Sequence, residues 1–267
     1  MIDAGKRSVL GVLVNIIDYD AAVQKIEAAI LNRSALSVSA LAVHGVMTGV
    51  LDREQRYRLN QFDLITPDGQ PVRWALNLLH HAGLHNRVYG PDLALKVCQL
   101  AERKGYSLYL YGSSAPVLAQ LQANLRQQLP NLQIVGAEPS RFRQLTPDGK
   151  GALIERIKQS QADIVFVGLG CPRQEVWAYE FRDALQKPIL AVGAAFDFLA
   201  GNKPQAPSWM QRYGLEWLFR LVYEPRRLWR RYLLLNPAYL ALLALQKLGL
   251  HRFDTQGTQP LSDLLYG

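Results

Sequence analysis

Two apolar segments, IVFVG at residues 164–168 and ILAVG at residues 189–193, decide the fold class. A strand that is exposed on one face alternates apolar and polar residues, whereas a strand buried on both faces has an uninterrupted apolar run. The residues between them, 172–185, have the spacing of a helix. Strand, helix and strand in this order predict a parallel sheet that is covered by helices on both faces.

The same alternation continues along most of the chain. Further strands are predicted where β-branched and aromatic residues cluster, at residues 8–14, 38–43, 62–66, 107–111 and 132–135. Further helices are predicted at residues 19–31, 46–59, 71–79, 91–103, 115–129 and 150–159. The predicted fold class is therefore α/β with a mostly parallel sheet, and ligands of such sheets bind beyond the carboxyl ends of the strands.

The composition indicates an ordinary globular protein. The chain has 267 residues, of which 49% are hydrophobic and 19% charged, which excludes a disordered, collagen-like or coiled-coil chain. Its two cysteines, Cys98 and Cys171, are too few for a disulfide framework, so we expect a reducing compartment. The first residues lack the apolar run and cleavage site of a signal peptide, and we therefore expect a cytoplasmic protein.

Residues 204–252 differ in character from the rest, and residues 253–267 are predicted to form a polar, loosely ordered tail. From residue 203 to residue 252 there are nine Lys or Arg and two acidic residues, so most of the net charge of +8 lies there. Pro225 is predicted to begin the second of two helices. The longest apolar run, residues 237–245, is far shorter than the ~20 residues that span a bilayer.

Two interpretations of this basic segment remain open. Its Trp, Tyr, Leu and Arg residues suit amphipathic helices that lie among lipid headgroups. A helical hairpin packed on the α/β domain is equally compatible with the sequence. Nucleic acid is a less suitable partner than lipid for a segment so rich in Trp and Leu.

Asp68 is the first candidate for chemistry. It lies in TPDG at residues 66–69, just after a predicted strand, where a carboxylate could act as a general base towards a hydroxyl group. Pro-Asp-Gly is also a common turn, and Asp is frequent at helix starts. TPDG occurs again at residues 146–149, so this tetrapeptide alone does not identify a site.

Glycines follow the predicted strand at residues 164–168. Gly168 and Gly170 would let backbone N–H groups approach a phosphate or a sugar. Arg173 and Gln174 come next and could reach a nucleotide from the first turn of the helix. Because Arg173 stands where G-x-G-x-x-G needs its third glycine, the dinucleotide fingerprint is incomplete, which disfavours an oxidoreductase.

Other loops at the same sheet edge offer further candidates. Asp197, after the predicted strand at residues 189–193, could accept hydrogen bonds from a ribose or could cap a turn. Arg87 stands at the entrance of a predicted helix. His81 and His85 have the i, i+4 spacing of metal ligands, but Gly83 lies between them and no third ligand is evident, so we predict a solvated helix end and no metal site there. No cofactor is predicted for the chain.

Five motifs in one order resemble the WecG/TagA/CpsF glycosyltransferases, glycosyltransferase family 26. These are TPDG, RVYGPDL, GLGCPRQE, VGAAFDFLAGNKPQAPSW and GLEWLFRLVYEPRRLWRRYL, and the resemblance extends from about residue 10 to residue 234. It implies a Rossmann-like catalytic domain, residues 1–203, followed by a membrane-associating appendage, residues 204–252.

The resemblance also implies an activity. The expected reaction is inverting, metal-independent transfer of a sugar, most simply an N-acetylhexosamine, from a UDP-sugar to a polyprenyl-diphosphate-linked sugar. It would serve surface polysaccharide synthesis at the inner face of the cell membrane, where the protein would be peripheral. The sequence leaves a homo-oligomer open.

Individual residues take their roles from the same resemblance. Asp68 falls on the proposed base of the family, and Arg87 and Gln174 fall on residues of its substrate site. The arginines thought to hold the nucleotide diphosphate match Arg220, Arg227 and either Arg230 or Arg231. Arg227 and Arg231 are spaced i, i+4, so one face of a helix can present both.

One segment departs from the family pattern. Many members carry Thr-x-Asn-x-Glu or Thr-x-Asn-x-Asp after the second strand, whereas residues 40–44 here read ALAVH. Ala40 and Ala42 lack the expected polar groups, although His44 could supply a hydrogen bond or act as an auxiliary acid or base. A second interpretation therefore remains open, in which the protein is a membrane-associated scaffold that binds nucleotide sugar without transferring it.

Overall fold

The computed structural model describes residues 1–267, and its centre is a six-stranded sheet with the strand order β4-β3-β8-β7-β5-β6. All five pairings between neighbouring strands are parallel. The strands are β3 (Leu36–Leu41), β4 (Leu64–Pro67), β5 (Ser107–Gly112), β6 (Gln133–Glu138), β7 (Ile164–Gly168) and β8 (Pro188–Ala191). The predicted α/β class with a parallel sheet is confirmed.

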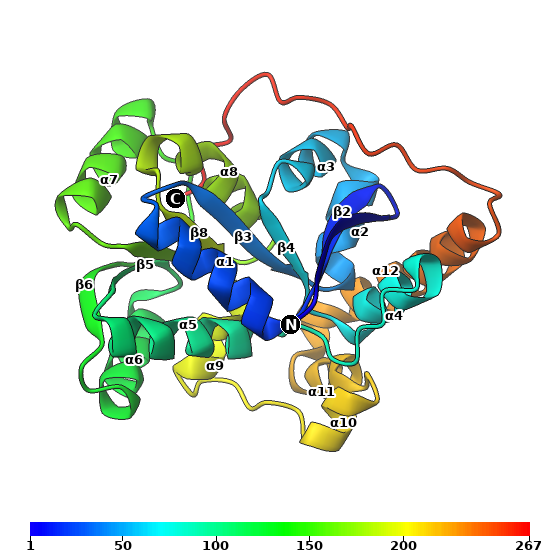
Figure 1. Ribbon diagram of the computed structural model, residues 1–267, viewed down its shortest axis with the longest axis horizontal. Helices are drawn as coiled ribbons and strands as arrows, with labels where there is room; N and C mark the ends of the chain where they lie inside the picture. Colours follow the sequence, from blue (N-terminus) through cyan, green and yellow to red (C-terminus); the bar gives the residue numbers. More distant parts are fainter.

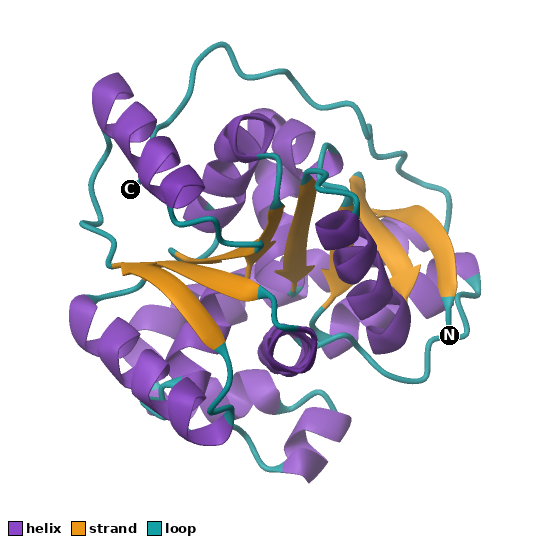
Figure 2. Ribbon diagram, turned by 60° about the vertical axis from the view of Figure 1, so that its left-hand side comes forward, coloured by secondary structure: helices purple, strands orange, loops and turns teal.

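Helices cover both faces of this sheet, as Figures 1 and 2 show. In β7, Val165 and Val167 belong to one hydrophobic core, while Ile164 and Phe166 belong to the other, as their uninterrupted apolar run predicted. One core is completed by α2 (Val43–Leu51), α3 (Arg53–Asn60), α4 (Gln70–His80), α7 (Pro147–Gln159) and α8 (Arg173–Leu185). The other core is completed by α1 (Tyr19–Leu31), α5 (Gly90–Lys104), α6 (Ala115–Gln128) and α9 (Gly193–Leu199).

The prediction of one strand at residues 8–14 is wrong. Two antiparallel strands, β1 (Asp3–Val9) and β2 (Val12–Ile17), form a separate hairpin. Its two-residue turn has φ of 55° at Leu10 and 87° at Gly11, and a turn with two positive φ values matches the twist of a hairpin. The turn escaped prediction because Leu10 is not a typical left-handed residue; its side chain is fully buried, which stabilises the arrangement.

The predicted helix at residues 46–59 is two helices, α2 and α3, which meet at Asp52. The Asp52 carboxylate accepts hydrogen bonds from the backbone N–H groups of Glu54 and Gln55, so it caps α3. Helix α2 also begins three residues earlier than predicted, at Val43. His44 consequently lies in the first turn of a helix at the carboxyl edge of the sheet.

Residues 204–252 contain α10 (Ser208–Arg212), α11 (Glu216–Tyr223) and α12 (Pro225–Lys247), which we call the appendage. Pro225 begins α12, as the sequence predicted. On the inner side of α12, Tyr239 is fully buried and its hydroxyl donates to the Pro71 carbonyl at 3.2 Å. Helix α12 therefore packs on the α/β domain along this side. None of the helices combines the length and the apolarity needed to cross a bilayer.

The tail, residues 253–267, runs along one side of the molecule from α12 to α7 and α8 (Figure 1). Glu180 accepts hydrogen bonds from the backbone N–H groups of Leu264 and Leu265. The Gly267 N–H donates to the Arg143 carbonyl at 3.0 Å. The end of the tail is thus anchored by hydrogen bonds, contrary to the loose order that its polar composition predicted.

Candidate functional site

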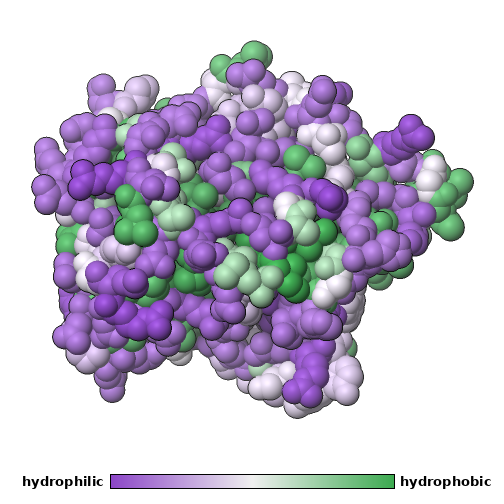
Figure 3. All heavy atoms as spheres, in the orientation of Figure 1, coloured by the Kyte–Doolittle hydropathy of each residue, from purple (hydrophilic) through white to green (hydrophobic).

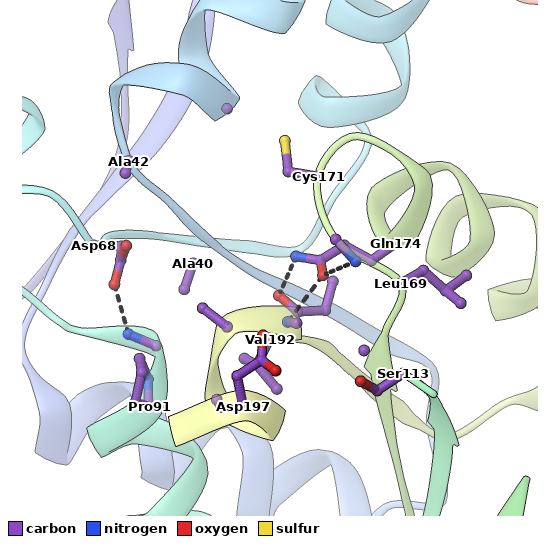
Figure 4. A pocket seen from close by; sticks show the side chains of 18 of the residues that line it. Ala40, Ala42, Asp68, Pro91, Ser113, Leu169, Cys171, Gln174, Val192 and Asp197 are labelled. Carbon is purple, nitrogen blue, oxygen red and sulfur yellow. Dashed lines mark hydrogen bonds between the residues drawn. The ribbon is translucent and has the colours of Figure 1, made fainter. Parts of the chain in front are cut away.

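A cavity of about 290 Å³ lies at the carboxyl ends of the strands, where the fold class predicts a ligand. Each strand leads into it: Asp68 follows β4, Ala42 follows β3, and Ser113 follows β5. Figure 4 shows Asp68 and Ser113 on opposite sides of this pocket. Arginines of the appendage complete its lining, so the site lies between the α/β domain and residues 204–252.

Asp68 lies beside the N-terminus of α5. Its Oδ1 accepts a hydrogen bond of 2.6 Å from the N–H of Gly90, the first residue of that helix. Ala40 and Ala42 also line this part of the cavity and bring only methyl groups to it (Figure 4). Burial raises the pKa of Asp68 to about 6, although the nearby Arg87 and the Gly90 N–H oppose the rise. At neutral pH the carboxylate is ionised and is more basic than an exposed aspartate.

Arg87 joins the domain to the appendage. Its Nη2 lies 2.6 Å from Glu216 Oε2 and 3.2 Å from Gln211 Oε1, and its guanidinium stacks over the Tyr89 ring at 4.2 Å. The Arg87 and Glu216 side chains are only 11% and 12% exposed. The sequence predicted substrate contact for Arg87; in this structure the same group holds α10 and α11 against the domain.

A second cavity, of about 80 Å³, shares part of its lining with the first. Asp68, Arg220 and Arg231 line both cavities, whereas His44 and Arg87 line only the second. Asp68 therefore lies between the two cavities.

Gln174 is fully hydrogen-bonded by the protein. Its Oε1 accepts from the N–H groups of Gly170 and Gly193, and its Nε2 donates to Glu175 Oε1 and to the Ala191 carbonyl. The sequence predicted that Gln174 binds substrate, but no donor or acceptor of the amide remains free. In this geometry Gln174 positions the loops after β7 and β8.

Both loops bring glycine backbone to the cavity, together with side chains such as that of Cys171 (Figure 4). Gly168 and Gly170 line it, and their contact with a phosphate or a sugar stays a prediction. A Cβ atom on Gly168 would lie 2.7 Å from the Phe196 ring, and one on Gly193 would collide with Gln174 Oε1. These glycines are therefore required by packing as well as by access to the cavity.

Asp197 lines the cavity and forms an ion pair with Lys203 at 2.8 Å. Lys203 also lies 3.0 Å from Glu224, which pairs in turn with Arg227. A ribose contact for Asp197 stays a prediction. Lys203 was not among the site residues predicted from the sequence, although it is the first cation of the basic segment and lies in one of the five family motifs.

Three of the four predicted diphosphate-binding arginines, Arg220, Arg227 and Arg231, line the cavity. Arg230 does not, because its guanidinium stacks over the Trp229 ring at 5.2 Å. Of the pair Arg230 and Arg231, which the sequence left open, only Arg231 lines the cavity, and its contact with a diphosphate stays a prediction. Arg173 is exposed and lies over the Tyr266 ring at 5.6 Å, outside the cavity lining.

Arg220 and Arg231 have no acidic partner in hydrogen-bond or ion-pair distance, and the Nε of Arg231 is buried without any hydrogen bond. Burial lowers the pKa of Arg231, but a guanidinium remains charged at neutral pH. Neither guanidinium is held in an ion pair, although the Asp68 carboxylate lines the same cavity. Two such cations favour an anionic ligand. No group of three or more His, Cys, Asp or Glu side chains is placed to hold a metal ion.

His44 is uncharged at neutral pH. Burial, together with the positive charge of Arg231, lowers the pKa of His44 to about 4. Its Nδ1 has no hydrogen-bond partner. The suggested role as an auxiliary acid therefore loses support near pH 7, whereas a hydrogen bond to a ligand remains available.

Comparison with known proteins identifies the family of this chain. The sequence model of the family described as Glycosyl transferase WecG/TagA/CpsF family matches residues 7–253, so this chain belongs to that family. A curated relative from Bacillus subtilis (strain 168) is 30% identical over 199 residues, covering 74% of this chain and 75% of the relative. That relative is named N-acetylglucosaminyldiphosphoundecaprenol N-acetyl-beta-D-mannosaminyltransferase. The family predicted from the five motifs is confirmed.

Proposed function

We propose that this protein transfers an N-acetylhexosamine from a UDP-sugar to a polyprenyl-diphosphate-linked sugar, with inversion at the transferred carbon. N-Acetylmannosamine is the first donor to test, because the B. subtilis relative is named for it. One observation carries the proposal: a basic carboxylate, Asp68, shares a cavity with two arginines that have no acidic partner, Arg220 and Arg231.

The proposed chemistry is a single displacement. Asp68 accepts the proton of the acceptor hydroxyl as its oxygen attacks the anomeric carbon of the donor. The bond between that carbon and the diphosphate oxygen breaks on the opposite side, and UDP leaves with the electron pair. Arg220, Arg227 and Arg231 would stabilise the negative charge that develops on UDP, so the mechanism requires no metal ion.

A second candidate function is a scaffold that binds nucleotide sugar without transfer. Ala40 and Ala42 favour it, because the wall beside Asp68 lacks the polar groups found in many family members. Incubation with radiolabelled UDP-sugars and a polyprenyl-diphosphate-GlcNAc acceptor separates the two. Labelled lipid product together with released UDP supports the transferase, and donor binding without either product supports the scaffold.

The pH dependence of transfer is a direct prediction from Asp68. Because its pKa is raised to about 6 and the ionised form is the base, kcat/KM should rise with pH and level off above about 7. Below pH 6 it should fall about tenfold per pH unit. His44, with a pKa of about 4, should add no ionisation between pH 5 and 8.

Initial rates from pH 4.5 to 8.5 at subsaturating donor would measure this profile. Circular dichroism at each pH serves as the control for folding. A rate that stays constant from pH 5 to pH 8 would contradict the assignment of Asp68 as the base.

We also propose that the protein is peripheral on the cytoplasmic face of the membrane, attached by the outer side of the appendage. Arg226, Trp229, Arg230 and Leu233 are exposed and are spaced i, i+3, i+4 and i+7, so they share one face of α12. Figure 3 shows further apolar side chains at the right-hand end of the molecule, where α12 ends. Arginine and tryptophan on one helical face suit an anionic lipid surface.

Replacing both Arg226 and Arg230 by glutamine should weaken binding to vesicles of anionic phospholipid about 30-fold, since each basic residue contributes roughly 1 kcal/mol there. Neither side chain lines the main cavity, so UDP binding should not change. The matched control replaces Arg33 and Arg103, two exposed arginines at other surfaces. Equal vesicle flotation of the two double variants would refute this attachment surface.

A further inference from the structure

The two ends of the cavity lie at opposite edges of the sheet. Asp68 follows β4 at one edge of the sheet, and Phe142 lies in the loop after β6 at the other edge. Five strand spacings of about 4.8 Å place these edges roughly 24 Å apart. A nucleotide sugar is a linear sequence of base, ribose, diphosphate and sugar. If the sugar reacts beside Asp68, the base must point towards the edge formed by β5 and β6.

Phe142 is the aromatic side chain that lines this far end. It is 50% exposed, although most large apolar side chains in the domain are buried. Its φ of 51° is in the left-handed region, which aromatic residues rarely adopt. Such a conformation persists only where the surrounding structure holds it.

The tail provides that support. The Phe142 N–H donates to Ser140 Oγ at 2.8 Å, and Ser140 Oγ donates to the Gly267 carbonyl at 2.6 Å. The Leu145 N–H donates to the Leu265 carbonyl at 2.6 Å. Residues 264–267 thus hold the loop on both sides of Phe142.

Ser113 lies next to this loop and completes the far end. The Ser140 N–H donates to the Ser113 carbonyl at 3.0 Å, so the loops after β5 and β6 are joined. Ser113 lines the cavity, and its hydroxyl has no hydrogen-bond partner in the protein. An exposed ring and a free hydroxyl together match a planar ligand with polar edges, because every nucleobase has a face that stacks on aromatic side chains.

We propose that Phe142 is the residue on which the nucleobase of the donor stacks, and that residues 264–267 are the positioning element that keeps it at the cavity. This assignment rests on the proposed function, because it requires a nucleotide donor. It gives the tail a role in donor recognition, although the tail lies outside the predicted catalytic domain.

Calorimetric titration with UDP and with inorganic pyrophosphate tests the stacking residue, because only UDP carries a base. Phe142→Ala should raise the Kd for UDP about 10- to 100-fold and leave the Kd for pyrophosphate within about twofold. Phe142→Trp should restore UDP binding. Val135→Ala is the matched control, because Val135 is also an exposed apolar side chain but lies on β6 itself. It should change neither the Kd for UDP nor the Kd for pyrophosphate.

Ser140→Ala tests the positioning element. It should weaken UDP binding about 3- to 10-fold without changing pyrophosphate binding, and Ser140→Thr should restore it. Ser160→Ala is the matched control, since Ser160 Oγ also joins a backbone N–H to a carbonyl, those of Ala162 and Ile157, far from the loop.

Four results would overturn the proposal. Unchanged UDP affinity in Phe142→Ala, or an equal loss for UDP and pyrophosphate, would exclude stacking of the base. Equal UDP affinities of Ser140→Ala and Ser160→Ala would exclude the positioning role. A wild-type protein that binds no UDP would overturn the proposed function itself, and this outcome is distinct from the other three.

Discussion

Asp68→Asn is expected to lower turnover about 10²- to 10⁴-fold, which is the usual effect of losing a positioned general base. Asparagine keeps the shape of the side chain but cannot accept the acceptor proton. The KM for the UDP-sugar should stay within a few-fold of the wild-type value, because Asp68 acts on the acceptor hydroxyl. Single-turnover measurement of labelled lipid product would give the rate.

The chain supplies its own matched control for this variant. Asp148 lies in the second TPDG segment, in the first turn of α7 and outside the cavity lining, so Asp148→Asn should have nearly normal turnover. Folding can be checked independently. Because burial raises the pKa of Asp68 from 3.8 to about 6, the folded state loses stability as the pH rises between these two values, and the loss is complete above about pH 6. Asp68→Asn should therefore keep or raise the thermal midpoint at pH 8.

Two outcomes would reject the role of Asp68. Near-normal turnover of Asp68→Asn would show that another group takes the proton. Equal losses in Asp68→Asn and Asp148→Asn would show that the effect does not arise at the cavity.

Arg231→Ala is expected to lower kcat about 10²- to 10³-fold, the size seen when one preorganised group is removed from a developing negative charge. Arg231 faces the cavity without an acidic partner, and alanine leaves the departing UDP with less positive charge nearby. Arg231→Lys should recover only part of the rate, because a lysine cannot form two parallel hydrogen bonds to a phosphate.

Arg230→Ala is the matched control for that variant, since Arg230 is the preceding residue but stacks on Trp229 outside the cavity. Its kcat should stay close to that of the wild type when measured with a water-soluble acceptor analogue.

Activity should persist in EDTA if arginines stabilise the leaving group. A larger loss in Arg230→Ala than in Arg231→Ala, or complete loss in EDTA, would contradict this part of the mechanism.

Most of the fold could be predicted from the sequence, because its main signals are local. The apolar run at residues 164–168 reports burial on both faces of one strand, and that strand is β7 in the structure. The place of Asp68 followed from the same pattern, since the end of a parallel strand marks the ligand edge. The single strand predicted at residues 8–14 was wrong because the chain reverses direction at Leu10, and the single helix predicted at residues 46–59 was wrong because Asp52 ends one helix and caps the next. In both places the apolar pattern continues past the break.

The candidate site was only partly predictable. The family motifs pointed to Asp68, Arg220, Arg227 and Gln174, and all four lie at the cavity. They did not predict that the Gln174 amide is fully occupied by protein groups. Phe142 and Ser113 lie in none of the family motifs, and only their place in the lining of the cavity identifies them as candidates.

The amino-acid order by itself determined the alternation of strands and helices, the basic character of residues 204–252 and the family. Tertiary structure alone decided which groups meet. Arg87 pairs with Glu216 across 129 residues of chain, and Ser140 contacts Gly267 across 127. Periodicity depends on neighbours within one element, so it can be read along the sequence. Contacts between distant elements depend on how whole helices and strands pack, and no local pattern records that packing.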